Sequence, residues 1–166
     1  MPQKGAARVS SFSRVLWVVI AAGVFVGDQV TKAIVQDSIP EHTAVPVFPH
    51  FFNLIQTKNP GAAFGLFSDS PAPWKTALLI VVSSALLAMV IAVMWRNQQL
   101  PWWMGLGLAL ILGGALSNLC DRIRFGRVVD FLDVYLGSYH WPAFNLADSA
   151  IVVGAGFLAL QLLFWE

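Results

Sequence analysis

The chain has 166 residues and a net charge of +1, and only 11% of its residues are charged whereas 57% are hydrophobic. A soluble domain carries about a quarter charged residues, so lipid rather than water is expected to cover much of this surface. The balanced charge gives no electrostatic case for nucleic-acid binding. The single cysteine, Cys120, excludes an internal disulfide and a multi-cysteine metal site.

Four apolar stretches predict four membrane-spanning helices, because each is near the roughly 20 residues that cross a bilayer. They cover residues 15–35, 76–94, 102–119 and 146–164. Since they leave no room for a separate soluble domain, residues 1–166 are expected to form a single integral membrane domain. Tryptophans fall near the expected span ends, where indole rings favour the headgroup level: Trp74, Trp95, Trp102, Trp103 and Trp165.

The first apolar stretch follows Lys4, Arg8 and Arg14, as the apolar core of a signal peptide would. Residues 27–29 (Gly-Asp-Gln) are a poor cleavage site, however, and apolar residues resume after them, so we expect a retained span. The same basic residues favour a cytoplasmic N-terminus, and four spans then return the C-terminus to the cytoplasm. Residues 37–73 and 120–144 would face outward. Because the second of these segments also contains arginines, the orientation rests mainly on the N-terminal tail.

In the first outer segment, residues 37–73, Pro40, Pro46, Pro49 and Pro60 punctuate β-prone residues. This pattern predicts a small β-sheet on the membrane surface, and residues 62–67 are expected to form a short amphipathic element at the interface. The predicted fold class is an all-α membrane protein of four transmembrane helices, with this small sheet and this short amphipathic element on the outer face.

The unusual polar residues are expected to converge on the outer face, because successive spans run in opposite directions. Ionisable residues at such positions are costly and by default suggest function. The converging residues are Asp28 in the first span, Asn59 and Asp130 in the outer segments, Asn118 and Arg122 at the end of the third span, and Asp148 at the start of the fourth.

Local spacing supports this convergence in the third span. Asn118 and Arg122 are four residues apart, so they share one face of a helix, and Gly114 lies on the same stripe. Gly113 and Ser117 form a small-xxx-small pair, which lets a neighbouring backbone approach closely. Helix packing alone would also account for these glycines.

Two carboxylates in one poorly solvated site would share a proton near neutral pH. The ionised one then takes a proton from water, while the other donates one to the carbonyl or to the leaving amine. Asp130 and Asp148 would together permit peptide hydrolysis without a metal or a covalent intermediate. Taken singly, Asp148 also fits a helix start capped by Asn145, and Asp130 fits an ion pair with Arg127. On spacing alone, Asp133 competes with Asp130.

Other hydrolytic sites fit the sequence less well. The three histidines lack H-E-x-x-H spacing, so a zinc site would lack its ligands, and no G-x-S-x-G elbow occurs. Cys120, flanked by Asp121 and Arg122, has no histidine near it in sequence and is interpreted as a bystander thiol. No metal and no cofactor is expected.

Five motifs occur in order along most of the chain, between residues 28 and 148. They are DQVTK (28–32), NPGAAF (59–64), GGALSNLCDR (113–122), VVDF (128–131) and FNLAD (144–148). Together they resemble the motifs of bacterial lipoprotein signal peptidase (signal peptidase II). Two positions depart from the family pattern: Ser117 stands where glycine is usual, and Cys120 where an apolar residue is common.

The resemblance implies an aspartate endopeptidase of the inner membrane that removes the signal peptide from prolipoproteins, cutting before the diacylglyceryl-modified cysteine. It implies Asp130 and Asp148 as the catalytic pair, at the periplasmic face. The residues expected to support the site and bind substrate are Asp28, Asn59, Gly61, Asn118, Arg122 and Asn145. Membrane lipid and globomycin-type inhibitors are the other partners that the resemblance implies.

Alternative functions follow from the residues alone. In a small proton-coupled transporter, Asp28, Asp130 and Asp148 would relay protons, but that function predicts polar residues at both faces rather than one. Another kind of intramembrane aspartate protease is a second alternative, although residues 25–28 (Phe-Val-Gly-Asp) lack the first glycine of a Gly-x-Gly-Asp signature. A non-enzymatic assembly subunit is a third.

Overall fold

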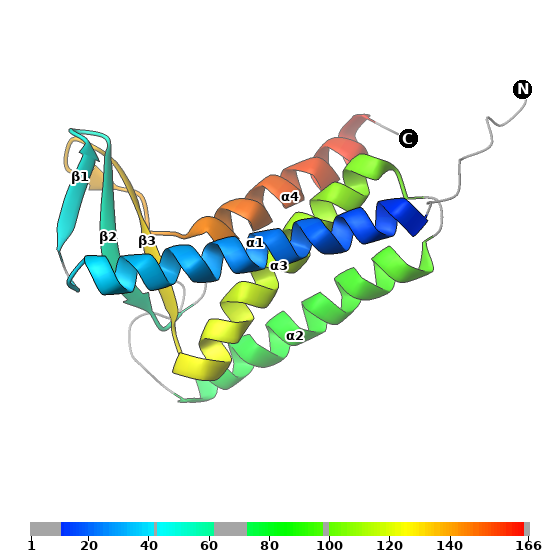
Figure 1. Cartoon of the computed structure of the whole chain (residues 1–166), viewed down its shortest axis with the longest axis horizontal. Helices are drawn as coiled ribbons and strands as arrows, with labels where there is room; N and C mark the ends of the chain where they lie inside the picture. Colours follow the sequence, from blue (N-terminus) through cyan, green and yellow to red (C-terminus); the bar gives the residue numbers. More distant parts are fainter. Residues whose placement is uncertain (1–10, 42, 62–72, 98–99, 165–166) are drawn as a thin grey trace, which may run out of the picture.

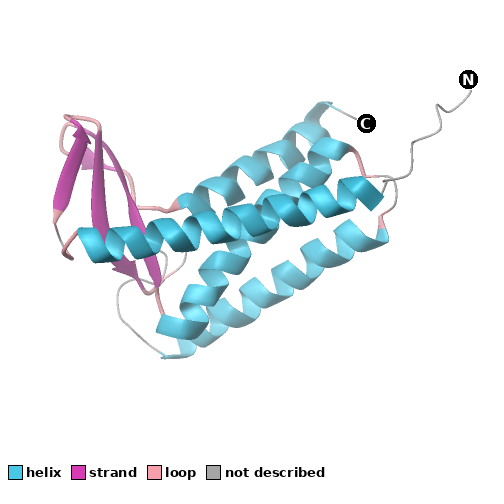
Figure 2. Ribbon diagram, viewed as in Figure 1, coloured by secondary structure: helices cyan, strands magenta, loops and turns pink. Residues whose placement is uncertain are grey.

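The computed structural model describes residues 11–41, 43–61, 73–97 and 100–164, which form a bundle of helices with a small sheet at one end (Figures 1 and 2). The helices are α1 (Ser11–Ser38), α2 (Pro73–Arg96), α3 (Trp102–Phe125) and α4 (Leu146–Phe164). The strands are β1 (Ala44–Phe48), β2 (Phe52–Asn59), β3 (Val128–Leu136) and β4 (Tyr139–His140).

All four predicted spans are confirmed as helices long and apolar enough to cross a membrane. The third continues further than expected, to Phe125 instead of residue 119. It ends at Gly126, which has a left-handed φ of 70° and whose N–H donates to the carbonyl of Arg122 at 2.9 Å. This is the usual glycine ending of a helix, and it keeps Asp121 and Arg122 on the helix.

The central helix, α3, packs against the other three helices, and two glycines allow its closest approaches. A Cβ on Gly113 would lie 2.4 Å from the carbonyl oxygen of Ala21 in α1. A Cβ on Gly114 would lie 2.4 Å from the carbonyl oxygen of Ala147 in α4. Both distances are far below van der Waals contact, so the backbones meet where no side chain would fit.

The sheet contains strands from both outer segments, in the antiparallel order β1-β2-β3-β4. The small sheet predicted in the first segment is confirmed, and it also takes β3 and β4 from the second segment, where the sequence had indicated no strand. Residues 128–133 of β3 are buried almost continuously, so they lack the polar–apolar alternation by which a half-buried strand is recognised. The amphipathic element expected at residues 62–67 lies outside the described residues.

Two apolar cores lie at opposite ends of the bundle. One includes Trp17 of α1, Met94 of α2 and Leu108 of α3. The other joins the end of α1 to the sheet through Val35, Ile39 and Phe131 of β3. Because this second core anchors the sheet on α1 (Figure 1), β3 lies across the ends of the helices that carry the polar residues.

Candidate active site

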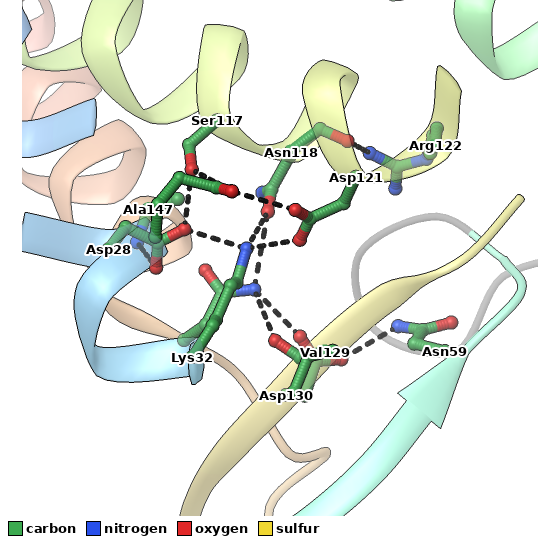
Figure 3. A network of polar contacts seen from close by, with 12 residues as sticks. Asp28, Lys32, Asn59, Ser117, Asn118, Asp121, Arg122, Val129, Asp130 and Ala147 are labelled. Atoms are coloured by element: carbon green, nitrogen blue, oxygen red, sulfur yellow. Dashed lines mark hydrogen bonds and ion pairs between the residues drawn. The ribbon is translucent and has the colours of Figure 1, made fainter. Parts of the chain in front are cut away.

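The predicted polar convergence is found where the helices meet the sheet. Asp28 comes from α1, Asn118 from α3, Asp130 from β3 and Asp148 from α4. Figure 3 shows the first three of these within one hydrogen-bonded network. Asn118 donates to Asp148 from Nδ2 to Oδ1 at 2.7 Å, which connects the fourth residue to the same network.

Asn145 links the start of α4 to β3. Its Oδ1 accepts from the backbone N–H of Asp148 at 2.8 Å, and its own N–H donates to Asp148 Oδ2 at 3.3 Å. This is the reciprocal arrangement of a capping box, which satisfies free N–H groups at a helix start. The Nδ2 of Asn145 donates to Asp130 Oδ1 at 2.7 Å. The capping function expected from the sequence is therefore combined with a bridge between the two candidate carboxylates.

Asp130 is 2% exposed, and two amides bind its carboxylate. Asn145 donates to Oδ1, and Asn59 of β2 donates from Nδ2 to Oδ2 at 3.0 Å. Burial raises the pKa of Asp130 from 3.8 to about 7, and the nearby charge of Asp148 adds to this increase. The two amides and the charge of Lys32 act in the opposite direction. Such a carboxyl can hold or release a proton near neutral pH.

Asp148 borders a pocket of about 510 Å³. Its other polar lining residues include Asn59 and Ser149, and the rest of the wall is formed mainly by apolar residues 141–144 and 151–153. A group that enters this pocket meets a carboxylate at one side and an apolar surface at the other. This combination suits a substrate that is polar at the reacting bond and apolar elsewhere.

Arg122 binds the backbone just after β2, at Gly61. Its Nη2 donates to the carbonyl of Gly61 at 3.0 Å, and its Nη1 to the carbonyl of Asn118 at 3.2 Å. Asn59 accepts from the N–H of Gly61 at 2.9 Å, which closes a tight turn beside the site. The Nε of Arg122 is buried without a hydrogen-bond partner in the described part of the chain.

A second polar layer lies behind the candidate carboxylates, and sequence reasoning missed its centre, Lys32. The ammonium of Lys32 binds Asp28 Oδ2 at 2.6 Å and Asp121 Oδ2 at 2.7 Å. Ser117 donates to Asp28 at 2.7 Å and accepts from Gln29 at 2.9 Å, so this serine adds polar contacts between α1 and α3. The spacing of Asp28 and Lys32, one helical turn apart, was the sequence signal for this layer.

Asp121 and Asp133, which lie near arginines in the sequence, are paired with other residues. Asp121 binds Lys32 and Gln29 rather than an arginine. Asp133 binds His140 Nδ1 at 2.8 Å and accepts from Asn53 Nδ2 at 2.8 Å. In both cases the partners lie on a neighbouring helix or strand, and distance along the sequence does not predict these contacts.

Among the described residues, no three His, Cys, Asp or Glu side chains gather closely enough to hold a metal ion. The same part of the chain contains Cys120 as a free, partly buried thiol on α3. Replacement of Cys120 by alanine is expected to leave peptide cleavage unchanged, because the hydrogen bonds that hold the candidate carboxylates come from asparagines and do not involve the thiol. Comparison of kcat and KM for C120A and wild type tests this, and a large fall in kcat would restore the thiol as a nucleophile.

The raised pKa of Asp130 has a consequence for stability. Because the folded state binds this proton more tightly than the unfolded state, wild-type stability falls as pH rises through about 7. Asparagine at this position does not ionise, so the thermal midpoint of Asp130→Asn relative to that of wild type is expected to rise as the pH increases from about 4 to about 7. Thermal unfolding of both proteins at a series of pH values measures this, and a difference in midpoint that does not change with pH would contradict it.

Comparison with known proteins identifies relatives of this arrangement. Residues 20–164 match the sequence profile of the family described as Signal peptidase (SPase) II. A lipoprotein signal peptidase of Solibacter usitatus is 43% identical over 144 residues, which cover 87% of this chain and 88% of that protein. One of Desulforapulum autotrophicum is 46% identical over 137 residues, covering 82% and 85%.

Two solved structures of bacterial membrane enzymes share the fold. One superposes with a TM-score of 0.80 at 32% identity and covers 89% of this chain and 87% of the other. The second has a TM-score of 0.81 at 29% identity and covers 97% and 99%. The similarity therefore includes the bundle and the sheet together.

Proposed function

The chain belongs to the signal peptidase II family, whose members cleave signal peptides from prolipoproteins, and from this premise we propose that it does so as an aspartic peptidase. Asp130 and Asp148 are the proposed catalytic pair. The family membership leaves the transporter alternative without support.

The observation that carries this proposal is the bridge made by Asn145. Its side-chain NH2 binds Asp130, while its side-chain oxygen and backbone N–H bind the first turn that holds Asp148. Two carboxyl groups from β3 and α4 are thereby kept beside each other, and the charge of Asp148 raises the pKa of Asp130. Such a pair retains one proton over a range of pH around neutrality.

The shared proton accounts for hydrolysis. The ionised carboxylate removes a proton from water, and the water oxygen bonds to the carbonyl carbon of the scissile peptide. The protonated carboxyl gives its proton to the carbonyl oxygen. As the C–N bond breaks, the carboxyl that took the water proton gives it to the amine nitrogen, and a hydroxyl of the tetrahedral intermediate returns its proton to the other carboxylate. One water is consumed, and the pair ends with the single proton with which it began.

The remaining site residues have proposed supporting functions. Arg122 and Asn59 hold the turn at Gly61 beside the site, through the carbonyl and the N–H of Gly61 respectively. Asn118 orients Asp148. Asp28 accepts the N–H of Ala147 at 2.9 Å and so fixes the start of α4.

The apolar wall of the pocket suits the lipid-bearing part of a diacylglyceryl prolipoprotein. The peptide bond before the modified cysteine would then lie beside Asp148. Membrane lipid and globomycin-type inhibitors are further proposed partners of this surface. We place the protein in the inner membrane as one peptidase domain, with both termini cytoplasmic and the site towards the periplasm. The basic N-terminal tail supports that orientation.

The test is incubation of the purified protein in lipid nanodiscs with a diacylglyceryl-modified prolipoprotein, followed by mass spectrometry of the products. Cleavage immediately before the modified cysteine is expected, and its rate should be unchanged by EDTA. The unlipidated precursor serves as the control and should remain uncut. Complete loss of cleavage with EDTA, restored by added metal, would replace the aspartic mechanism with a metal-dependent one.

A further inference from the structure

Lys32 has all the contacts that its ammonium group can make, although it touches neither proposed catalytic carboxyl. It lies on α1 and is 3% exposed. Its three N–H donors meet three oxygens: Asp28 Oδ2 at 2.6 Å, Asp121 Oδ2 at 2.7 Å and Asn118 Oδ1 at 3.0 Å. Two carboxylates suffice to balance a buried ammonium, so the third contact, to a neutral amide, requires a separate explanation.

The contact with Asn118 determines which end of that amide faces Asp148. An asparagine side chain has an accepting oxygen and a donating NH2 of similar size, so its orientation depends on its neighbours. Lys32 has only donors, and the Nδ2 of Asn145 also points to the same oxygen, at 3.3 Å. Both neighbours require the oxygen of Asn118 on their side. The NH2 is left on the opposite side, where it donates to Asp148 at 2.7 Å.

We propose that Lys32 is a positioning residue for the reaction, which holds Asn118 with its NH2 directed at Asp148. This inference rests on the proposed function of Asp148 as a member of the catalytic pair. Without the ammonium, only the longer contact from Asn145, at 3.3 Å, holds the amide of Asn118, which can then turn and present its oxygen to the carboxylate. The two oxygens would repel each other, and Asp148 would leave the geometry that hydrolysis requires.

The charge of Lys32 provides a second measurable consequence. The charged side chains that interact with the ammonium are Asp28 of α1, Asp121 of α3, Asp130 of β3 and Asp148 of α4. The positive charge of Lys32 lowers the pKa of Asp130 and opposes the effect of burial. Its removal should therefore shift the proton affinity of the pair upward, so that the acidic limb of the kcat–pH profile moves to higher pH.

The experiment replaces Lys32 by methionine, which has similar length and no charge, in the Asp121→Asn background. Lys32 with Asp28 and Asp121 has one positive and two negative charges, a net charge of −1. The double variant K32M/D121N keeps that net charge, because one cation and one anion are removed together. Its references are wild type, which has the same net charge, and D121N, which differs from it only at residue 32; thermal unfolding confirms that all three are folded. A loss of activity relative to both references is then not explained by a change in net buried charge alone.

The expected result for K32M/D121N is a fall in kcat of about 100-fold relative to D121N, because small displacements of catalytic groups have effects of this size. KM should change little, and the acidic limb should move to higher pH. If Lys32 acts through Asn118, the same replacement in an N118A/D121N background should lower kcat only a few-fold. Lys58→Met, at a lysine paired with Glu41 on the sheet, is the matched control and should behave as wild type.

A kcat for K32M/D121N equal to that of D121N would overturn the proposal, and so would an undiminished 100-fold loss in the N118A background. Asp130→Asn and Asp148→Asn are measured in the same assay. If those two variants remain active, the catalytic pair itself is wrong. If they are inactive while K32M/D121N is fully active, only the positioning function of Lys32 fails.

Discussion

Replacement of either Asp130 or Asp148 by asparagine is expected to abolish cleavage, with a loss of rate on the order of 10⁴-fold for each single variant. Asparagine has nearly the shape of aspartate but neither removes a proton from water nor donates one to a leaving amine. Because each carboxyl performs one half of the proton transfer, either loss alone should be as severe as both together. Product formation from a diacylglyceryl-modified prolipoprotein, measured over long incubations by mass spectrometry, gives the residual rate.

Asp133→Asn is the matched control for this experiment. Asp133 lies on the same strand as Asp130 and is also buried, but its partners are Asn53 and His140. It should retain most of the wild-type kcat. Thermal unfolding of each variant separates loss of chemistry from loss of fold. An active Asp130→Asn or Asp148→Asn, or an inactive but folded Asp133→Asn, would assign the reaction to different carboxyl groups.

Gly114→Ala is expected to have the second largest effect, on stability and activity together. The added Cβ would lie 2.4 Å from the carbonyl oxygen of Ala147, which is backbone and cannot turn away. Overpacking of this kind costs about 1–3 kcal/mol. Because Asn118 follows one turn later on α3 and Asp148 adjoins Ala147, separation of the helices also lengthens the Asn118–Asp148 contact. We expect kcat to fall by about 100-fold.

Gly156→Ala is the control for the glycine replacement. Gly156 lies on the same helix as Ala147, and a Cβ there would meet nothing within 4 Å. This variant should therefore be as stable as wild type or slightly more so, with unchanged kcat. Normal kcat and thermal midpoint in Gly114→Ala would show that the α3–α4 contact yields easily and does not set the position of Asp148.

The helices were predictable from the sequence because each needs only a local property, an apolar stretch of sufficient length. The end of α3 was less predictable, because residues 120–125 are polar enough to resemble a loop. The helix ends at Gly126, whose backbone is left-handed. The sheet was predicted only in part, because β3 pairs with β2 across a distance of about 70 residues and is buried on both faces.

The choice between Asp130 and Asp133 shows what spacing could not supply. Residues three apart on a strand point to opposite faces. Asp130 thus meets Asn145 and the helix ends, whereas Asp133 meets His140 of β4. Without knowledge that residues 128–136 form a strand, the two aspartates were equivalent, and only the family resemblance distinguished them. Lys32 was missed because its partners are 86 and 89 residues away, on α3.

The hydrogen bond from Ala147 to Asp28 connects the first helix to the last across 119 residues of sequence. Helices of a membrane protein enter the bilayer in the order of synthesis, so Asp28 is in place long before Ala147 exists. Until α4 arrives, Asp130 has neither Asn145 nor Asp148 beside it. A partly synthesised chain would therefore lack the proposed catalytic pair, and proteolytic capacity would arise only when the final span docks.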